Sequence, residues 1–365
     1  MKKVAVNFES WKKIPMNQAN SEIFVNIRLG KNTKFGEESF FICKDPQNIE
    51  IGDSVNIGNN VKIVCEKIRL EENVTIGNNV DIRSNNITIG RNTSIGNNIN
   101  LLAPNKFSIG KNSTLEEEIS VKCREFIAGS FLQFYKGAVV GKGGKFGINS
   151  KVTIGDGCFI GKNTLINPSE EIIIGDDVGI GDEVQIWTHG GYLSVLDGFP
   201  AVFAPVKIGN HVWLPSRCIV LPNVTIGSNV VIGINSLVNK NIPSGCLAAG
   251  IPCKVLKENI YPRKLQKEEL TKIINNVIKL YHPLMKDKNI IAKIDYDKRK
   301  NIILFIREKQ LTIYNLTNMT ISGIIDEETE DFRDFLRRNG IKFFTNKKFK
   351  SIIPSAFKKL LEVNL

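Results

Sequence analysis

The sequence predicts a mainly β protein whose largest part is a parallel β-helix, a solenoid of short strands. From Pro205 to Cys253 one aliphatic residue recurs at every sixth position, namely Ile208, Leu214, Val220, Ile226, Ile232 and Val238. Small or polar residues trail these positions, and Gly directly follows three of them. A short fixed period of this kind is typical of a β-solenoid, in which each unit supplies one strand and one corner. Gly and Asn suit the corners, where positive φ is needed.

The same period extends the predicted β-helix over residues 49–258. It begins at Ile51 and Ile57 and resumes in later blocks, one of which contains Ile148, Ile154, Ile160 and Ile166. Slips of one or two residues between blocks fit bulged corners. The repeats are enough for roughly ten coils, because three units make one coil. We expect residues 1–48 to cap the open strand edge, with short strands at 4–8, 23–27 and 40–42.

One interruption differs from the slips. Between Ile186 and Ile208 the spacing is 22 residues, which is not a multiple of six. The segment 188–207 is rich in Gly, Pro and aromatic residues, so we expect it to leave the β-helix as a long loop. Long loops on a rigid scaffold commonly carry functional residues. This loop contains His189, one of the three histidines in the chain.

After residue 258 the period ends, and the sequence predicts a small basic α+β domain over residues 259–365. Its expected elements are a helix at 264–282, four strands at 290–296, 301–306, 310–316 and 319–325, a helix at 327–340 and a last helix from about Pro354. From residue 254 onward there are 24 Lys+Arg and 14 Asp+Glu, so about +10 of the net charge of +12 lies here. This charge indicates either an anionic partner, such as a membrane surface or an acidic glycan, or a plain solvated surface. Nucleic acid is the least expected partner, because no binding motif accompanies the charge.

The cysteines indicate a reduced protein. The seven cysteines form no CxxC pair and are odd in number, which argues against a disulfide framework. Cys43, Cys158 and Cys218 lie among apolar residues and are expected in the core. No apolar run has the length of a signal peptide or a membrane-spanning helix. We therefore expect a cytoplasmic protein, with peripheral contact at the inner membrane face as an alternative.

The run IGNHVWLPSRCIVLPNVTIGSNVVIGINSLVNKNIP (208–243), followed by AAGIPCKVLKE (248–258), resembles the terminal coils of hexapeptide-repeat acyltransferases. The most similar type is that of the galactoside, maltose and polysaccharide O-acetyltransferases. The resemblance covers about 148–258 well, 48–147 as bare repeat, and the C-terminal domain not at all. It implies a left-handed parallel β-helix, a homotrimer, acetyl-CoA bound between subunits as co-substrate, and one histidine as general base. The left hand follows from the resemblance alone, since connection rules favour a right-handed crossover.

The resemblance places the general base at His189. An imidazole with a pKa near neutrality can take the proton from an attacking hydroxyl or amine. The sequence does not fix the acid that would orient it, since Asp182, Glu183 and Asp197 all lie near. Four aromatic residues would stack on an acceptor sugar or pack the loop onto its own subunit: Trp187, Tyr192, Phe199 and Phe203.

For acetyl-CoA the resemblance implies a set of residues in the terminal coils. Trp213 would line the cofactor groove, and Ser216 would hydrogen-bond the thioester end. The pantetheine arm would follow the corner formed by Gly233, Ile234 and Asn235. The family usually has a small residue at the position of Ile234. The chain has neither a P-loop nor a GxGxxG helix start, so lysines would bind the CoA phosphates. The candidates are Lys240 and Lys257, and the alternative for each is a solvated surface lysine.

The sequence therefore predicts an acetyl-CoA-dependent O-acetyltransferase that acts on a sugar hydroxyl of a surface polysaccharide or its precursor. Transfer would be direct in a ternary complex, because no Ser or Cys nucleophile stands beside a base motif. No metal is expected, since the three histidines are scattered along the chain. N-acetylation of an amino sugar nucleotide would use the same base. A non-catalytic β-solenoid scaffold or binding protein is the third alternative, although it gives no reason for His189, the loop and Trp213 to lie together.

Overall fold

A computed structural model describes residues 12–15, 27–43, 45–354 and 357 of the chain. The chain divides into two compact units, Met1–Pro262 and Arg263–Leu365. Each unit has a hydrophobic core of its own. Among the helices of the described residues, none is long and apolar enough to cross a membrane.

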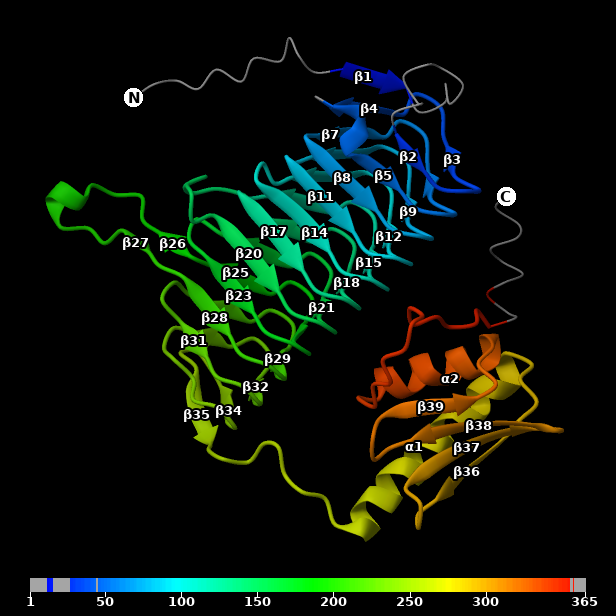
Figure 1. Cartoon of the computed structure of the whole chain (residues 1–365). Coiled ribbons are helices and arrows are strands. Elements are labelled where there is room, and N and C mark those ends of the chain that lie inside the picture. Colours follow the sequence, from blue (N-terminus) through cyan, green and yellow to red (C-terminus); the bar gives the residue numbers. More distant parts are fainter. Residues whose placement is uncertain (1–11, 16–26, 44, 355–356, 358–365) are drawn as a thin grey trace. The chain divides into compact units, whose positions relative to one another are not determined.

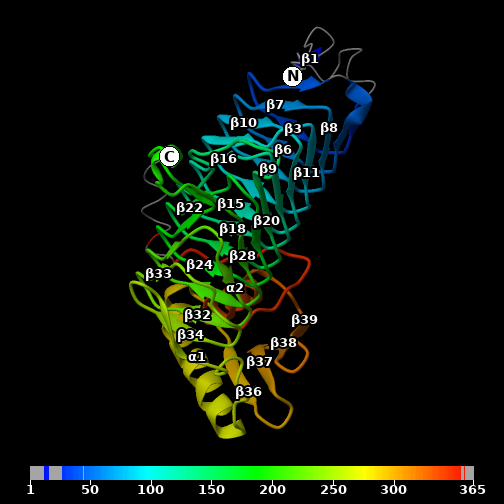
Figure 2. The same ribbon diagram turned by 90° about the vertical axis from the view of Figure 1, so that its left-hand side faces the viewer.

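The first unit is a parallel β-helix, as predicted (Figure 1). The coils have three flat faces, which are called A, B and C. In each coil the chain runs from face B to face C and then to face A, with one short strand on each face. Equivalent strands of neighbouring coils pair in parallel, so the strands of one face form one sheet. Figure 2 shows the same stack of coils after a quarter turn.

Face A carries the strands that lead to the predicted catalytic loop. Its strands are β1 (Lys12–Pro15), β4 (Phe40–Cys43), β7 (Lys62–Cys65), β10 (Val80–Arg83), β13 (Ile99–Leu102), β16 (Ser120–Lys122), β19 (Val139–Val140), β22 (Leu165–Asn167), β25 (Gln185–Trp187), β30 (Ile219–Val220) and β33 (Leu237–Val238). β1 is antiparallel to β4 and covers the edge of this face.

Face B follows face A around each corner. Its strands are β2 (Arg28–Leu29), β5 (Ile49–Ile51), β8 (Lys67–Leu70), β11 (Asn86–Ile89), β14 (Lys106–Ile109), β17 (Glu125–Ala128), β20 (Lys151–Ile154), β23 (Ile172–Ile174), β28 (Val206–Ile208) and β31 (Thr225–Ile226). A short 3-10 helix, η3 (Pro46–Asn48), precedes β5.

Face C completes each coil. Its strands are β3 (Lys34–Phe35), β6 (Asn56–Ile57), β9 (Thr75–Ile76), β12 (Ser94–Ile95), β15 (Thr114–Leu115), β18 (Gln133–Phe134), β21 (Phe159–Ile160), β24 (Gly179–Ile180), β29 (Val212–Leu214), β32 (Val230–Ile232), β34 (Leu247–Ala249) and β35 (Lys254–Lys257). β35 runs antiparallel to β34 and ends the sheet.

The six-residue period marks the interior of the coils, as predicted. Its aliphatic side chains from Ile51 to Val238 are buried, with the exception of Ile148. The corners hold asparagines at positive φ whose amides form ladders: Asn60 Nδ2 donates to Asn79 Oδ1, and Asn79 Nδ2 donates to Asn98 Oδ1, both at 3.0 Å. All seven cysteines are free and buried. Burial raises the pKa of Cys65 and Cys123 to about 12, which keeps both thiols protonated.

The prediction for Ile148 is wrong. This side chain is 74% exposed, because residues 141–150 leave the coil between β19 and β20. Its spacing of six from Ile154 is a coincidence, because Ile148 lies within a glycine-rich segment outside the coil. This segment, with the sequence GKGGKFGINS, is called the lysine loop below.

The β-helix also begins earlier than predicted. β2, β3 and β4 form a coil that pairs in parallel with β5, β6 and β7, so residues 28–43 belong to the β-helix and not to a cap over 1–48. Leu29, Phe35 and Phe41 keep the six-residue spacing, but two aromatic rings obscure the aliphatic pattern. The predicted strand at 40–42 is β4. The strand predicted at 4–8, and all but the last residue of that at 23–27, lie outside the described residues.

The second unit is an α+β domain with the predicted order of elements. It comprises α1 (Lys267–Asp287), a four-stranded antiparallel sheet and α2 (Glu327–Arg338); the strands are β36 (Lys293–Asp297), β37 (Ile302–Arg307), β38 (Gln310–Asn315) and β39 (Thr320–Gly323). Asp326 caps α2 in a capping box with Thr329. Buried Asp331 accepts hydrogen bonds from Tyr281 Oη at 2.6 Å and Lys288 Nζ at 2.7 Å, which ties α2 to the end of α1. Of the helix predicted from Pro354, only Pro354 and Phe357 lie among the described residues up to residue 357.

Candidate functional site

The predicted loop is a hairpin that projects from the coils between β25 and β28 (Figure 1). Residues 188–205 leave the coil, and Val206 rejoins face B at the start of β28. Two short antiparallel strands form the base of the hairpin, β26 (His189–Gly190) and β27 (Val202–Phe203), with His189 opposite Phe203. A 3-10 turn, η4 (Val195–Asp197), shapes the tip. His189 therefore lies at the base of the hairpin, against the coils, at the corner between faces A and B.

Two of the predicted acceptor residues contact the His189 ring. Phe203 stacks on it with ring centroids 5.9 Å apart and an interplanar angle of 13°. Trp187 meets it edge-on at 5.7 Å, and its Nε1–H donates to Gln185 Oε1. The imidazole is thus half-buried between two aromatic rings. Burial lowers the pKa of His189 below its ordinary value of 6.5.

A serine, not a carboxylate, contacts the imidazole. His189 Nδ1 lies 3.0 Å from Ser169 Oγ. Among the described residues the three acids that the sequence left open lie elsewhere: Asp182 accepts from the Lys162 N–H, Glu183 pairs with Arg217, and Asp197 lies in η4. A neutral partner adds no charge that would favour the imidazolium, so the lowered pKa and the contact agree.

Buried Thr188 fixes the corner that carries Ser169. Its hydroxyl donates to the carbonyl of Asn167 at 2.8 Å and accepts from the backbone N–H groups of Ser169 and Glu170 at 2.7 and 3.0 Å. Thr188 is fully buried, so these bonds are shielded from water. The residue next to His189 thereby holds the partner of its imidazole.

The lysine loop leaves the β-helix two coils before the hairpin and contacts the same corner, which carries Asn167 and Ser169. The Lys145 N–H donates to Ser169 Oγ at 2.9 Å, and the Lys142 N–H donates to Asn167 Oδ1 at 3.3 Å. Gly144, at φ +77°, lies against the imidazole edge, because a Cβ there would come within 2.7 Å of both Cε1 and Nε2 of His189. The sequence prediction missed Ser169, Gly144 and Lys145. The four glycines and two lysines of GKGGKFG were the available signal.

The remaining predicted acceptor residues do not contact His189 among the described interactions. Tyr192 is 98% exposed and Phe199 is also exposed, both in the outer part of the hairpin. Leu196, at 94% exposed, adds a third apolar side chain there. The hairpin therefore presents an apolar end to its surroundings.

The predicted cofactor residues lie mainly along a different edge. Trp213 projects outward from face C and covers Gly179, where a Cβ would lie 2.5 Å from the indole. Ser216 follows at the corner between faces C and A, and its carbonyl accepts from the N–H of Asn235 in the next coil. Gly233 and Ile234 belong to the same corner as Asn235, with the Ile234 side chain exposed.

Both predicted phosphate lysines are exposed, on separate elements. Lys240 follows β33 at the corner between faces A and B, on the same edge as His189. Lys257 ends β35 on face C. One subunit thus does not gather all the predicted cofactor residues beside His189.

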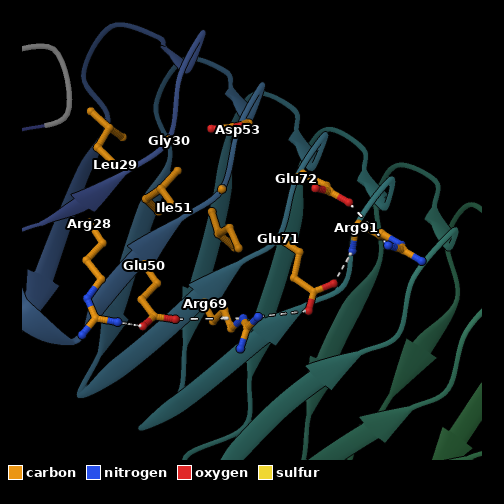
Figure 3. A pocket seen from close by; sticks show the side chains of 12 residues that line it. Arg28, Leu29, Gly30, Glu50, Ile51, Asp53, Arg69, Glu71, Glu72 and Arg91 are labelled. Carbon is orange, nitrogen blue, oxygen red and sulfur yellow. Dashed lines mark hydrogen bonds and ion pairs between the residues drawn. The ribbon is translucent and has the colours of Figure 1, made fainter.

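The described residues contain no group of three or more His, Cys, Asp or Glu side chains that could hold a metal ion. A separate hollow lies on the first coils, where Arg28, Glu50, Arg69 and Glu71 form a chain of ion pairs across three coils (Figure 3). The backbone N–H of Arg91 donates to Glu71 Oε2 at 3.0 Å, and its guanidinium pairs with Glu72. These charges neutralise one another and join neighbouring coils, so the hollow is best explained as part of the scaffold.

Two family models match the coils around the site. The bacterial transferase hexapeptide (six repeats) matches residues 205–240, and the hexapeptide repeat of succinyl-transferase matches residues 151–181. Both segments lie next to the hairpin in the sequence.

Curated proteins match over short segments. The galactoside O-acetyltransferase of Escherichia coli K12 is 52% identical over 54 residues, which are 15% of this chain and 27% of that protein. An E. coli K12 protein provisionally named a lipopolysaccharide biosynthesis O-acetyl transferase is 43% identical over 60 residues, 16% of this chain and 31% of that protein. The chain spans about a third or less of the length of these relatives. Among solved structures, a galactoside acetyltransferase in complex with coenzyme A is 29% identical, with 43% of this chain and 70% of that chain covered and a TM-score of 0.32.

We predict that replacing Ser169 by Asp raises the pKa of His189 by about one unit or more, because a carboxylate beside Nδ1 favours the imidazolium. In the wild-type protein the pKa of His189 lies below 6.5. The measurement is an NMR pH titration of the histidine ring signals, assigned to His189 by their loss in His189→Ala. Ser169→Ala is the control and keeps the low pKa. An unchanged pKa in Ser169→Asp would show that Ser169 does not contact the imidazole in solution.

Proposed function

We propose that this chain, which belongs to the hexapeptide-repeat family of bacterial transferases, is an acetyltransferase that moves an acetyl group from acetyl-CoA to a sugar hydroxyl. The single observation that carries the proposal is the half-buried His189, whose Nδ1 contacts neutral Ser169 and whose pKa is lowered. Such an imidazole is unprotonated at neutral pH and is ready to act as a base. The names of the two relatives, both O-acetyltransferases, support the acyl group and the hydroxyl acceptor.

In the proposed reaction Nδ1–H donates to Ser169 Oγ, which leaves the lone pair of His189 Nε2 free. The acceptor hydroxyl loses its proton to Nε2 while its oxygen attacks the thioester carbonyl carbon. A new C–O bond forms, the C–S bond then breaks, and the CoA sulfur takes the proton back from Nε2. The products are an acetyl ester and CoA, and no covalent enzyme intermediate is formed. N-acetylation of an amino sugar would follow the same course with an amine in place of the hydroxyl.

The placement of the two residue sets supports a site between subunits. Ser216 lies at the corner between faces C and A, and His189 lies at the corner between faces A and B. The strands of face A separate these corners by roughly 15 Å within one subunit, since a strand rises about 3.3 Å per residue. In a homotrimer the Trp213 and Ser216 edge of one subunit would meet the His189 edge of its neighbour. Acetyl-CoA would then lie between them, with Lys240 and Lys257 available for its phosphates.

The proposal also assigns a role to the basic second unit. It would hold the enzyme near an anionic membrane surface or an acidic glycan, which suits a cytoplasmic enzyme acting on precursors of surface polysaccharide. The excess of 24 Lys+Arg over 14 Asp+Glu from residue 254 onward motivates this role. A scaffold without activity is the competing proposal, and it predicts no acetyl-CoA binding at all.

Calorimetric titration of acetyl-CoA into the wild-type protein and His189→Ala tests the activity. We predict micromolar binding to both proteins, because His189 is placed at the acceptor and not along the cofactor. Transfer to a panel of sugars should fall about 100-fold or more in His189→Ala, as expected for loss of a general base. Absence of acetyl-CoA binding by the wild-type protein would remove the enzyme proposal and favour the scaffold.

The contact of Gly144 with the imidazole gives a second prediction. Gly144→Ala should lower kcat/KM by about tenfold or more, because its Cβ would displace both Ser169 Oγ and the ring of His189 from their positions. Gly143→Ala is the matched control in the same loop, since a Cβ there meets no atom within 4 Å. Equal effects of the two substitutions would mean that the loop does not position His189.

A site between subunits predicts complementation. His189→Ala and Trp213→Ala subunits should each be inactive alone, whereas co-expressed subunits should recover about a quarter of wild-type activity by random assembly of a cyclic trimer. The measurement is transfer activity of the purified mixed oligomer, with its mass determined by light scattering. A monomeric mass, or no recovery in the mixed oligomer, would contradict the proposed site.

A further inference from the structure

We infer that the acceptor is acidic: the sugar carries a carboxylate or phosphate group that binds the lysine loop beside His189. This inference rests on the proposed function, because it concerns the acceptor of the proposed transfer. The acidic group would bind at residues 141–150, a segment that the six-residue period had assigned to the coils.

The lysine loop is built onto the site from several sides. Besides the bonds to Asn167 and Ser169, Asn149 Nδ2 donates to Glu170 Oε2 at 2.9 Å, and Ser150 Oγ donates to the carbonyl of Pro168 at 2.5 Å. The loop is thus anchored along the whole corner 167–170, next to the corner that carries His189. Its backbone is held in place, while its lysine side chains stay exposed.

Two cation–π contacts involve residues of the lysine loop. Lys145 Nζ lies 3.8 Å from the centroid of the Phe203 ring, the same ring that stacks on His189. Lys122 Nζ lies 6.0 Å from the centroid of Phe146, whose ring is 41% exposed. Lys142 is also exposed in this loop. Aromatic rings offer stacking surfaces for the apolar face of a sugar, and ammonium groups bind anions.

The charges of this surface are not balanced within the part of the chain that the structure describes. There, neither Lys122, Lys142 nor Lys145 has an ion-pair partner. The described carboxylate that contacts the loop, Glu170, accepts from Asn149 instead. By contrast, the arginines and glutamates of the first coils neutralise one another (Figure 3). Unpaired ammonium groups on a loop that contacts the candidate general base fit an anionic acceptor better than a neutral one.

The test compares neutral, uronate-containing and phosphorylated oligosaccharides of matched length as acceptors and as ligands. The variants are Lys142→Gln/Lys145→Gln and a control with the same loss of charge, Lys67→Gln/Lys106→Gln, whose side chains are exposed on face B. Transfer gives kcat/KM for each acceptor, and calorimetry at low and high salt gives binding. The backbone N–H of Lys145, which bonds Ser169, is retained in the variant.

We expect the wild-type kcat/KM for one of the acidic acceptors to exceed that for the neutral acceptor by about tenfold or more. A charge-assisted contact between the lysines and the acidic group would provide a difference of this size. This ratio should fall about tenfold in Lys142→Gln/Lys145→Gln, should decline with salt, and should be unchanged in the control. The uronate and phosphate arms identify which anion is bound.

Preference for the neutral acceptor, or an acid preference that the lysine substitutions leave intact, would overturn the inference while the transferase proposal stands. Binding of an acidic oligosaccharide that depends on Lys142 and Lys145 but is followed by no acetyl transfer would overturn the transferase proposal and leave only an anionic ligand site at the lysine loop. Absence of both acidic binding and transfer would overturn the two together.

Discussion

The stacking of coils in register is the constraint on which the rest of the structure depends. Each inward aliphatic side chain lies on its equivalent in the next coil, and parallel strand pairing fixes that alignment along all three faces. A shift by one residue would turn every inward side chain outward, so the register is strongly specified. Residues at equivalent corners therefore lie above one another with little freedom. This is why Asn167 and Thr188, from successive coils, can share a buried hydrogen bond.

Insertions are tolerated at the corners because they leave the inward positions unchanged. Two long insertions leave the coils at the same corner, residues 141–150 after β19 and residues 188–205 after β25. The short corner 168–171 lies between them in the stack. Ser169 at that corner contacts both, through the Lys145 N–H on one side and His189 on the other. The candidate site is thus a consequence of where two loops leave a regular scaffold.

The β-helix could be predicted from sequence because its signal is local and repeated. The hairpin could also be predicted, because it breaks that period, and His189 could be recognised within it. Ser169 could not be found in this way, because it lies twenty residues before His189 and only the stacking of coils brings them together. Ile148 is the opposite case: it has the correct spacing, but its side chain does not point into the coil. Leu29, Phe35 and Phe41 keep the period but were missed because two of the three are aromatic, which obscures the aliphatic pattern.

The choice of serine beside the imidazole affects the chemistry in two directions. A neutral partner favours the unprotonated imidazole, which suits the proposed role of His189 as a base, but it would not stabilise the imidazolium that forms when the acceptor proton is taken. Lys145 places an ammonium group on the Phe203 ring that stacks on His189, and Lys142 lies exposed in the same loop. An anionic acceptor paired with the lysines of the loop would bring negative charge to the site at the moment when the imidazolium develops. The base would then be effective mainly with the proposed acidic substrate in place, so that the acceptor itself would contribute to the electrostatics of its own acetylation.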